Sequence, residues 1–158
     1  MKPTSSRCLI LACGNTLRGD DGAGPWLAEW AKLRFQSETN IRVVSRQQWA
    51  PELAEEVARA ESVLFVDCSV ESAPGAVKIV PVQPSVGTEG LTTHQLSAAQ
   101  LLALGRDLYD SLPRNAQLLT IGAGSTELGE EFSDAVKAAL PEACQLLEAT
   151  VLRLLKGQ

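Results

Sequence analysis

Two apolar runs constrain the fold of this chain more than any other feature. Residues 7–14 alternate only weakly between apolar and polar side chains, and residues 62–69, which read SVLFVDCS, are almost continuously apolar. A strand with one solvated face would alternate regularly, whereas strands in parallel sheets are covered by helices on both faces. The two runs therefore predict strands of a sheet that is buried on both sides.

The rest of the chain alternates between strand and helix patterns. Apolar or β-branched runs predict three further strands, at 40–47, 76–82 and 116–124. Helical spacing of apolar residues, or a proline suited to a first turn, predicts helices at 22–35, 51–60, 93–108 and 133–155. The alternation predicts an α/β fold of three layers, in which the sheet lies between two layers of helices.

Prolines and tryptophans add local expectations. Pro81 cannot donate to a strand ladder, so the strand that contains it is expected at a sheet edge. Pro141 is expected to open a new segment within the last helix, because proline breaks a helix interior. Trp26, Trp30 and Trp49 are expected in the core or at its rim, and Trp49 could also line a pocket, since it follows the second strand at the same sheet edge.

Composition bounds the class of protein. A chain of 158 residues without repeats or linkers predicts one domain, 1–158. No apolar run approaches the roughly 20 residues of a membrane span, so no membrane association is expected. The net charge of −5, with no cluster of Lys or Arg, argues against a nucleic-acid partner. A monomer is expected.

The four cysteines favour a reducing compartment. They lack the CxxC spacing of zinc sites and the density of a disulfide framework. Three of them lie in apolar stretches, where cysteine acts as a small hydrophobic residue. We therefore expect a cytoplasmic protein with free thiols at Cys8, Cys13, Cys68 and Cys144.

A glycine-rich loop follows the first predicted strand and reads GNTLRGDDGAG, 14–24. Such loops often cradle phosphate, but this one lacks the lysine of a P-loop and matches the dinucleotide pattern poorly. Asp20 and Asp21 would repel a pyrophosphate. The same charges would attract a cation, so the loop favours a cation site over a nucleotide site.

Further polar residues are expected at the same edge of the sheet. Asp67 lies at the end of the strand 62–69, and His94, the only histidine, lies at the start of the predicted helix 93–108. Ligands of open α/β sheets bind beyond the carboxyl ends of the parallel strands. Carboxylates and an imidazole that converge there indicate a metal site or an acid–base site.

Each of these residues also has a purely structural interpretation. Asp20 or Asp21 could cap the helix that begins near residue 22, since aspartate is a favoured N-cap. Asp67 could be satisfied by hydrogen bonds from a loop, and His94 could be an exposed residue beside a helix cap. The shared edge of the sheet, rather than any single residue, is what favours a functional site.

Several motifs together resemble one family. GNTLRGDDGAG resembles the opening signature of the nickel–iron (NiFe) hydrogenase maturation endopeptidases, also called hydrogenase maturation proteases. The resemblance continues, in order, through 47–77, through THQLSAAQLLAL at 93–104 and through 118–136. It covers nearly the whole chain. Its specific part is the first motif together with Asp67 and His94, which follow it in the same order along the chain as in the family.

The resemblance implies a fold, an activity and a site. The implied fold is a twisted, mainly parallel five-stranded sheet with helices on both faces, like that of phosphorylases and related hydrolases. The implied activity is removal of a short C-terminal extension from the hydrogenase large-subunit precursor after nickel insertion. The implied catalytic and nickel-binding residues are Asp21, Asp67 and His94. The nickel would be carried by the precursor, and Asp20 would support the site or cap a helix.

Two stretches depart from the family pattern, and two other functions stay open. The stretch 122–126 (GAGST) lacks an expected proline, and 45–49 (SRQQW) lacks a glycine-containing stretch, which leaves the hydrogenase partner undefined. One alternative function is a hydrolase of nucleoside or nucleotide-linked substrates on a similar sheet. The other is a non-enzymatic maturation factor that binds nickel or a partner.

Overall fold

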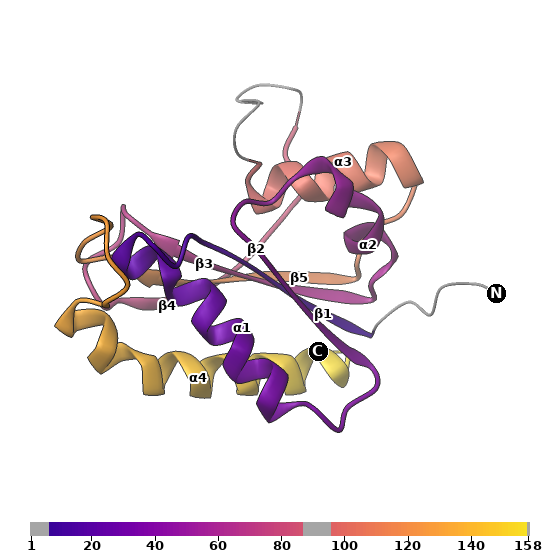
Figure 1. Ribbon diagram of the computed structural model, residues 1–158. Helices are drawn as coiled ribbons and strands as arrows, with labels where there is room; N and C mark the ends of the chain where they lie inside the picture. The colour runs from indigo at the N-terminus through magenta and orange to yellow at the C-terminus, as the bar shows by residue number, and fades with distance from the viewer. Residues whose placement is uncertain (1–6, 87–95, 158) are drawn as a thin grey trace.

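A five-stranded sheet forms the centre of the protein, in the order β2-β1-β3-β5-β4 (Figure 1). The computed structural model describes residues 7–86 and 96–157. Four strands are mutually parallel, and β4 runs antiparallel to β5. The strands are β1 (Cys8–Cys13), β2 (Ile41–Arg46), β3 (Ser62–Ser69), β4 (Val77–Pro81) and β5 (Asn115–Gly122).

Helices cover both faces of the sheet. Helices α1 and α4 lie on one face, and α2 and α3 lie on the other (Figure 1). Short 3₁₀ turns, η1 (Gly19–Gly22) and η2 (Pro51–Leu53), precede α1 and α2. The helices are α1 (Ala23–Arg34), α2 (Ala54–Arg59), α3 (Ala98–Tyr109) and α4 (Asp134–Leu155).

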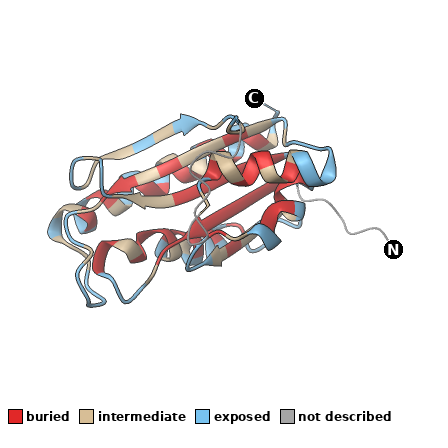
Figure 2. Cartoon of the chain, turned by 90° about the horizontal axis from the view of Figure 1, so that it is seen from above, coloured by how far each residue is buried: buried red, intermediate tan, exposed pale blue. Residues whose placement is uncertain are grey.

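Successive residues of β1 enter opposite cores, as the weakly alternating apolar run requires. Cys8, Ile10 and Ala12 pack with α1 and α4, whereas Leu9 and Leu11 pack with α2 and α3. All six residues of β1 are buried, and Figure 2 shows the buried centre of the sheet. The edge strand β4 has no fully buried residue. The predicted three-layer α/β fold with a mainly parallel sheet is confirmed, including the edge position of β4.

Two predicted helix boundaries are wrong. Helix α4 runs without a break through Pro141, so this proline does not open a new segment. Buried residues on both sides of it, such as Ala139 and Ala143, keep the helix docked on the sheet, and that packing overrides the local preference. Helix α3 begins at Ala98 rather than 93, because Ser97 and Gln100 form a capping box there.

No helix in the described ranges is long and apolar enough to cross a membrane. All four cysteines are free thiols. Trp49 is only 6% exposed and packs edge-on against Phe65, with 5.1 Å between ring centroids. This tryptophan therefore belongs to the core between the sheet and α2 and α3, which confirms the core position expected for it.

Glycines let the start of α1 lie directly against the carboxyl ends of β1 and β3. A Cβ atom on Gly24 would stand 2.3 Å from the carbonyl oxygen of Cys13 and 3.3 Å from that of Val66. A Cβ on Gly14 would stand 1.9 Å from the carbonyl oxygen of Asp21. Only hydrogen fits at these two positions, so the glycines set how closely the loop and helix approach the sheet.

Replacement of Gly24 by alanine should therefore destabilise the protein by about 2 kcal/mol or more, because the backbone of β1 must shift. Gly22→Ala is the matched comparison, since its Cβ would come no closer than 3.2 Å to the Cα of Thr16 and 3.5 Å to the ring of Phe132. Urea unfolding of the two variants should rank Gly24→Ala as clearly less stable. Equal stabilities would contradict the close approach of α1 to the sheet.

Candidate active site at the carboxyl edge of the sheet

The acidic residues of the glycine-rich loop lie in the 3₁₀ turn Gly19–Gly22, which we call the acid turn. This turn connects β1 to α1 at the carboxyl edge of the parallel strands. Its two aspartates differ in environment, since Asp20 is fully buried and Asp21 is partly exposed. This difference in burial suggests a structural role for Asp20 and a ligand-binding role for Asp21.

The Asp21 carboxylate is oriented by the start of its own loop. Its Oδ2 accepts a hydrogen bond of 2.7 Å from the backbone N–H of Asn15. The Asn15 side chain in turn accepts from the backbone N–H of Leu17. No described residue donates to Oδ1 of Asp21, so one carboxylate oxygen is fixed and the other is available to a ligand.

Asp67 lies near the end of β3, between strands β1 and β5. Its Oδ1 accepts a 2.7 Å hydrogen bond from the backbone N–H of Cys68. Burial raises the pKa of Asp67 to about 6, against the opposing effect of hydrogen bonds from Cys68 and the Cys13 thiol. The negative charge of Asp21 adds to the rise. The two carboxylates are therefore within electrostatic reach, as the shared sheet edge predicted.

Two thiols flank Asp67, and the sequence analysis did not assign them to the site. The Cys13 thiol hydrogen-bonds to Asp67, and burial is the main reason that its pKa is raised. Burial raises the pKa of Cys68 to about 12, with further contributions from Asp21 and Asp67. Both thiols therefore stay protonated at neutral pH. Their positions at the ends of neighbouring strands are the signal that could have identified them.

Asp20 holds two loops together. Its carboxylate accepts four hydrogen bonds of 2.7–3.0 Å, from the backbone N–H groups of Gly124, Ser125 and Ser133 and from the Ser133 hydroxyl. Burial alone would raise the pKa of Asp20, but these hydrogen bonds lower it below its usual value. The carboxylate therefore stays ionised although it is fully buried.

This arrangement corrects the expectation that Asp20 caps the helix after the glycine loop. Neither the acid turn nor α1 has a side-chain cap. Asp20 acts instead on the other end of the chain, because Ser133 is the N-cap residue of α4. The contact fixes the stretch that departs from the family pattern, 122–126, against the acid turn.

The expected third residue, His94, lies outside the described residues. Within the described ranges, no group of three histidine, cysteine or acidic side chains is arranged to hold a metal ion. Asp21 and Asp67 present two carboxylates at one edge, so a metal would need a further ligand. The assignment of Asp21, Asp67 and His94 to one site stays a prediction.

The glycine-rich loop and the loop packed against it have few free backbone N–H groups that could bind a phosphate. A phosphate cradle uses free backbone N–H groups, yet Asn15 donates to Asp21, and Gly124 and Ser125 donate to Asp20. The aspartates thus occupy donors that a phosphate would need, and they add negative charge. The local chemistry favours a cation, in agreement with the charge argument from the sequence.

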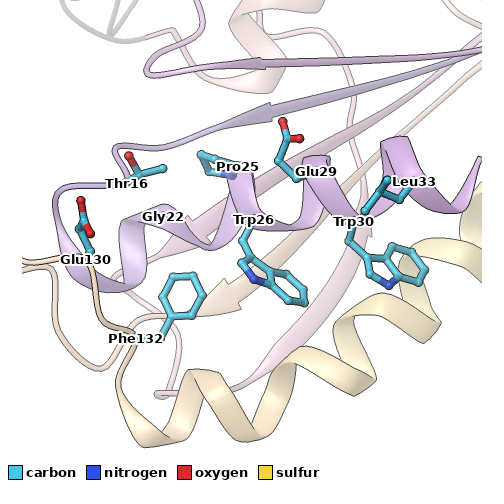
Figure 3. Close-up of a pocket in the computed structure, with 9 residues that line it drawn as sticks. All are labelled: Thr16, Gly22, Pro25, Trp26, Glu29, Trp30, Leu33, Glu130 and Phe132. Carbon is cyan, nitrogen blue, oxygen red and sulfur yellow. The ribbon is translucent and has the colours of Figure 1, made fainter. Parts of the chain in front are cut away.

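A groove of about 650 Å³ adjoins the acid turn along α1, with its aromatic rings on the side that faces α4 (Figure 3). The acid turn contributes Gly22 to its wall, and the rings of Trp26, Trp30 and Phe132 dominate its surface. The groove therefore offers an apolar surface beside the carboxylates.

Several solved structures with a similar fold are hydrogenase maturation endopeptidases. The hydrogenase maturating endopeptidase HybD from E. coli matches with a TM-score of 0.74 and 21% identity, over 93% of each chain. The hydrogenase maturation protease HycI from Thermococcus kodakarensis KOD1 matches with a TM-score of 0.67 and 23% identity, over 96% of this chain and 93% of its own.

A third solved structure is somewhat closer in sequence. The NiFe hydrogenase maturation protease HybD from Thermococcus kodakarensis is 27% identical, with a TM-score of 0.62, over 91% of this chain and 98% of its own. No family model matches the sequence, and no curated protein matches it. The chain thus has the fold of hydrogenase maturation endopeptidases, as the sequence resemblance implied.

Asp20→Asn should destabilise the protein by about 3 kcal/mol, because an amide cannot accept all the hydrogen bonds that the buried carboxylate accepts. Asp134→Asn is the matched control, since Asp134 is exposed in the first turn of α4. Chemical unfolding of both variants measures the difference. If the two variants were equally stable, Asp20 would not hold the loops together.

Asp67 should make the free energy of unfolding fall as the pH rises from 3.8 to about 6 in chelator-treated protein. Over this range the unfolded chain has released the Asp67 proton while the folded protein still holds it, so rising pH favours unfolding. Asp67→Asn removes this contribution and should be more stable than the wild type at pH 7, by about 2 kcal/mol. If the free energies of unfolding of the wild type and Asp67→Asn changed with pH in the same way, the raised pKa of Asp67 would be refuted.

Proposed function

We propose that this protein is an endopeptidase that removes the C-terminal extension of a nickel-loaded NiFe-hydrogenase large-subunit precursor. The observation that carries the proposal is the pair of carboxylates, Asp21 and Asp67, at the carboxyl edge of a sheet with the fold of hydrogenase maturation endopeptidases. The sequence motifs of that family support it, in particular the acid turn and the ordered aspartate and histidine.

In this proposal nickel belongs to the substrate. Asp21, Asp67 and His94 bind the nickel ion that the immature large subunit carries. A neutral imidazole beside two carboxylates suits a borderline metal such as nickel, whereas carboxylates alone would favour magnesium or calcium. Precursor without nickel would lack this contact, so the metal acts as a checkpoint before cleavage.

Cleavage then needs a polarised water and a group that takes its proton. A water polarised by the substrate nickel attacks the carbonyl carbon of the scissile peptide. One of the two carboxylates, Asp21 or Asp67, is the candidate for the base that takes this proton. The backbone N–H groups of Asn15 and Cys68 orient the two carboxylates.

The large-subunit precursor is the proposed partner, and the protein is proposed to act as a monomer in the cytoplasm. Four free cysteines suit a reducing compartment.

Mass spectrometry of the precursor tests the function. The purified large-subunit precursor, with and without nickel, is incubated with this protein. We expect loss of a short C-terminal peptide from the nickel-loaded sample alone. A complex that forms without any change in precursor mass would mean a non-enzymatic maturation factor instead.

Asp21→Asn and His94→Ala should each lower the cleavage rate by at least about a hundredfold, because the first removes the negative charge of a nickel ligand and the second removes a ligand altogether. Asp107→Asn is the matched control, since Asp107 is exposed on α3. Rates are measured with the same nickel-loaded precursor. Normal rates for both site variants would show that the site is assigned to the wrong residues.

A further inference from the structure

The groove along α1 is a feature that the proposed reaction does not use. It has a volume of about 650 Å³ and runs along α1 from the acid turn. In Figure 3 the rings of Trp26, Trp30 and Phe132 lie on the side of α1 that faces α4. We call it the α1 groove, and its lining residues are Thr16, Gly22, Pro25, Trp26, Glu29, Trp30, Leu33, Glu130 and Phe132.

Helix α1 presents a second apolar stripe to this groove. Leu27, Ala28 and Ala31 already bury the inner face of the helix against the sheet. Trp26, Trp30 and Leu33 follow the i, i+4, i+7 spacing of one helix face. Trp26 is 40% exposed and Leu33 is 70% exposed. Large apolar side chains gathered in one exposed groove are typical of a surface that binds a partner.

Two acidic side chains lie beside the apolar side chains of the α1 groove. Glu29 and Glu130 both line the groove, and both are exposed. Lys32 is the one cation bonded to Glu29, at 3.0 Å, and no ion pair of Glu130 is found among the described residues. These carboxylates disfavour phosphates, nucleotides and anionic lipids and favour a segment with Lys or Arg beside its apolar side chains.

The groove adjoins the acid turn of the candidate active site. Gly22 belongs to both the acid turn and the groove, next to Asp21. The two loops at this end pair through their backbones, since Gly19 donates to Gly129 at 2.7 Å and Gly129 donates to Leu17 at 2.8 Å. A chain segment seated in the groove therefore passes next to the acid turn that carries Asp21.

We propose that the α1 groove binds an amphipathic segment of the large-subunit precursor, with large apolar side chains on the Trp26–Trp30–Leu33 stripe and Lys or Arg facing Glu29 and Glu130. This inference rests on the proposed function and adds the surface that holds the precursor. A second copy of this chain fits less well, because a symmetric contact would bring the same carboxylates together.

Leu33→Glu and Trp26→Ala test the apolar stripe. Each should raise KM for the nickel-loaded precursor by about tenfold and leave kcat largely unchanged, because the contacts hold the substrate in ground and transition states alike. Leu108→Glu is the matched control, since Leu108 is 61% exposed on α3, on the opposite face of the sheet. Leu33 is exposed, so Leu33→Glu should fold even if Trp26→Ala does not.

The double variant Glu29→Lys with Glu130→Lys tests the charge of the partner. It should raise KM and weaken the dependence of KM on salt, because the attraction to basic side chains is lost. Glu38→Lys, at an exposed position after α1, is the matched control and should behave as the wild type. A lower KM for the double variant would show that the segment is acidic and would overturn the proposal.

Other outcomes separate the groove from the reaction. If the groove variants keep the wild-type KM while Asp21→Asn abolishes cleavage, the groove proposal is wrong and the proposed function stands. If the wild type binds the precursor but never cleaves it, and Leu33→Glu loses this binding, the function is wrong and the groove stands. A wild-type dimer in sedimentation that Leu33→Glu dissociates would make the groove a self-association surface and overturn the proposal.

Discussion

The buried carboxylate of Asp20 is the interaction on which the functional end of the molecule depends. It accepts four hydrogen bonds from three residues of the loop between β5 and α4. A buried charge is costly unless its hydrogen-bonding capacity is met, and here the donors also keep it ionised. The acid turn and the start of α4 are thereby fixed relative to each other.

Several features follow from this contact. With Asp20 committed to the loops, Asp21 is left to face the sheet edge, where Asn15 orients one of its oxygens. The loop held by Asp20 also carries Glu130 and Phe132 to one side of the α1 groove. The two neighbouring aspartates thus have different roles. Asp20 connects the acid turn to the loop before α4, and Asp21 is available to a ligand. The groove and the carboxylates share the acid turn, which is why we connect substrate docking with the reaction.

The sequence predicted most of the fold because its signals are local. Continuous apolar runs identified the strands, and Pro81 marked the edge strand. The hydrogen bonds of Asp20 to the loop before α4 were not predictable, because the partner residues lie 104 to 113 residues further along the chain. Helix α4 continues through Pro141 because tertiary packing outweighs the local preference. Asp21 and Asp67 were predicted to share an edge, whereas the thiols of Cys13 and Cys68 were missed because apolar surroundings suggested a packing role.

Recognition of the substrate nickel by Asp21 and Asp67, at the carboxyl edge of the sheet, is the central claim. Its most direct test is the dissociation constant for nickel-loaded and nickel-free large-subunit precursor, measured by titration calorimetry with the wild type and with Asp21→Asn. We predict that the wild type binds the nickel-loaded precursor more tightly and that this preference is smaller in Asp21→Asn. Equal affinity of the wild type for both forms would contradict the account.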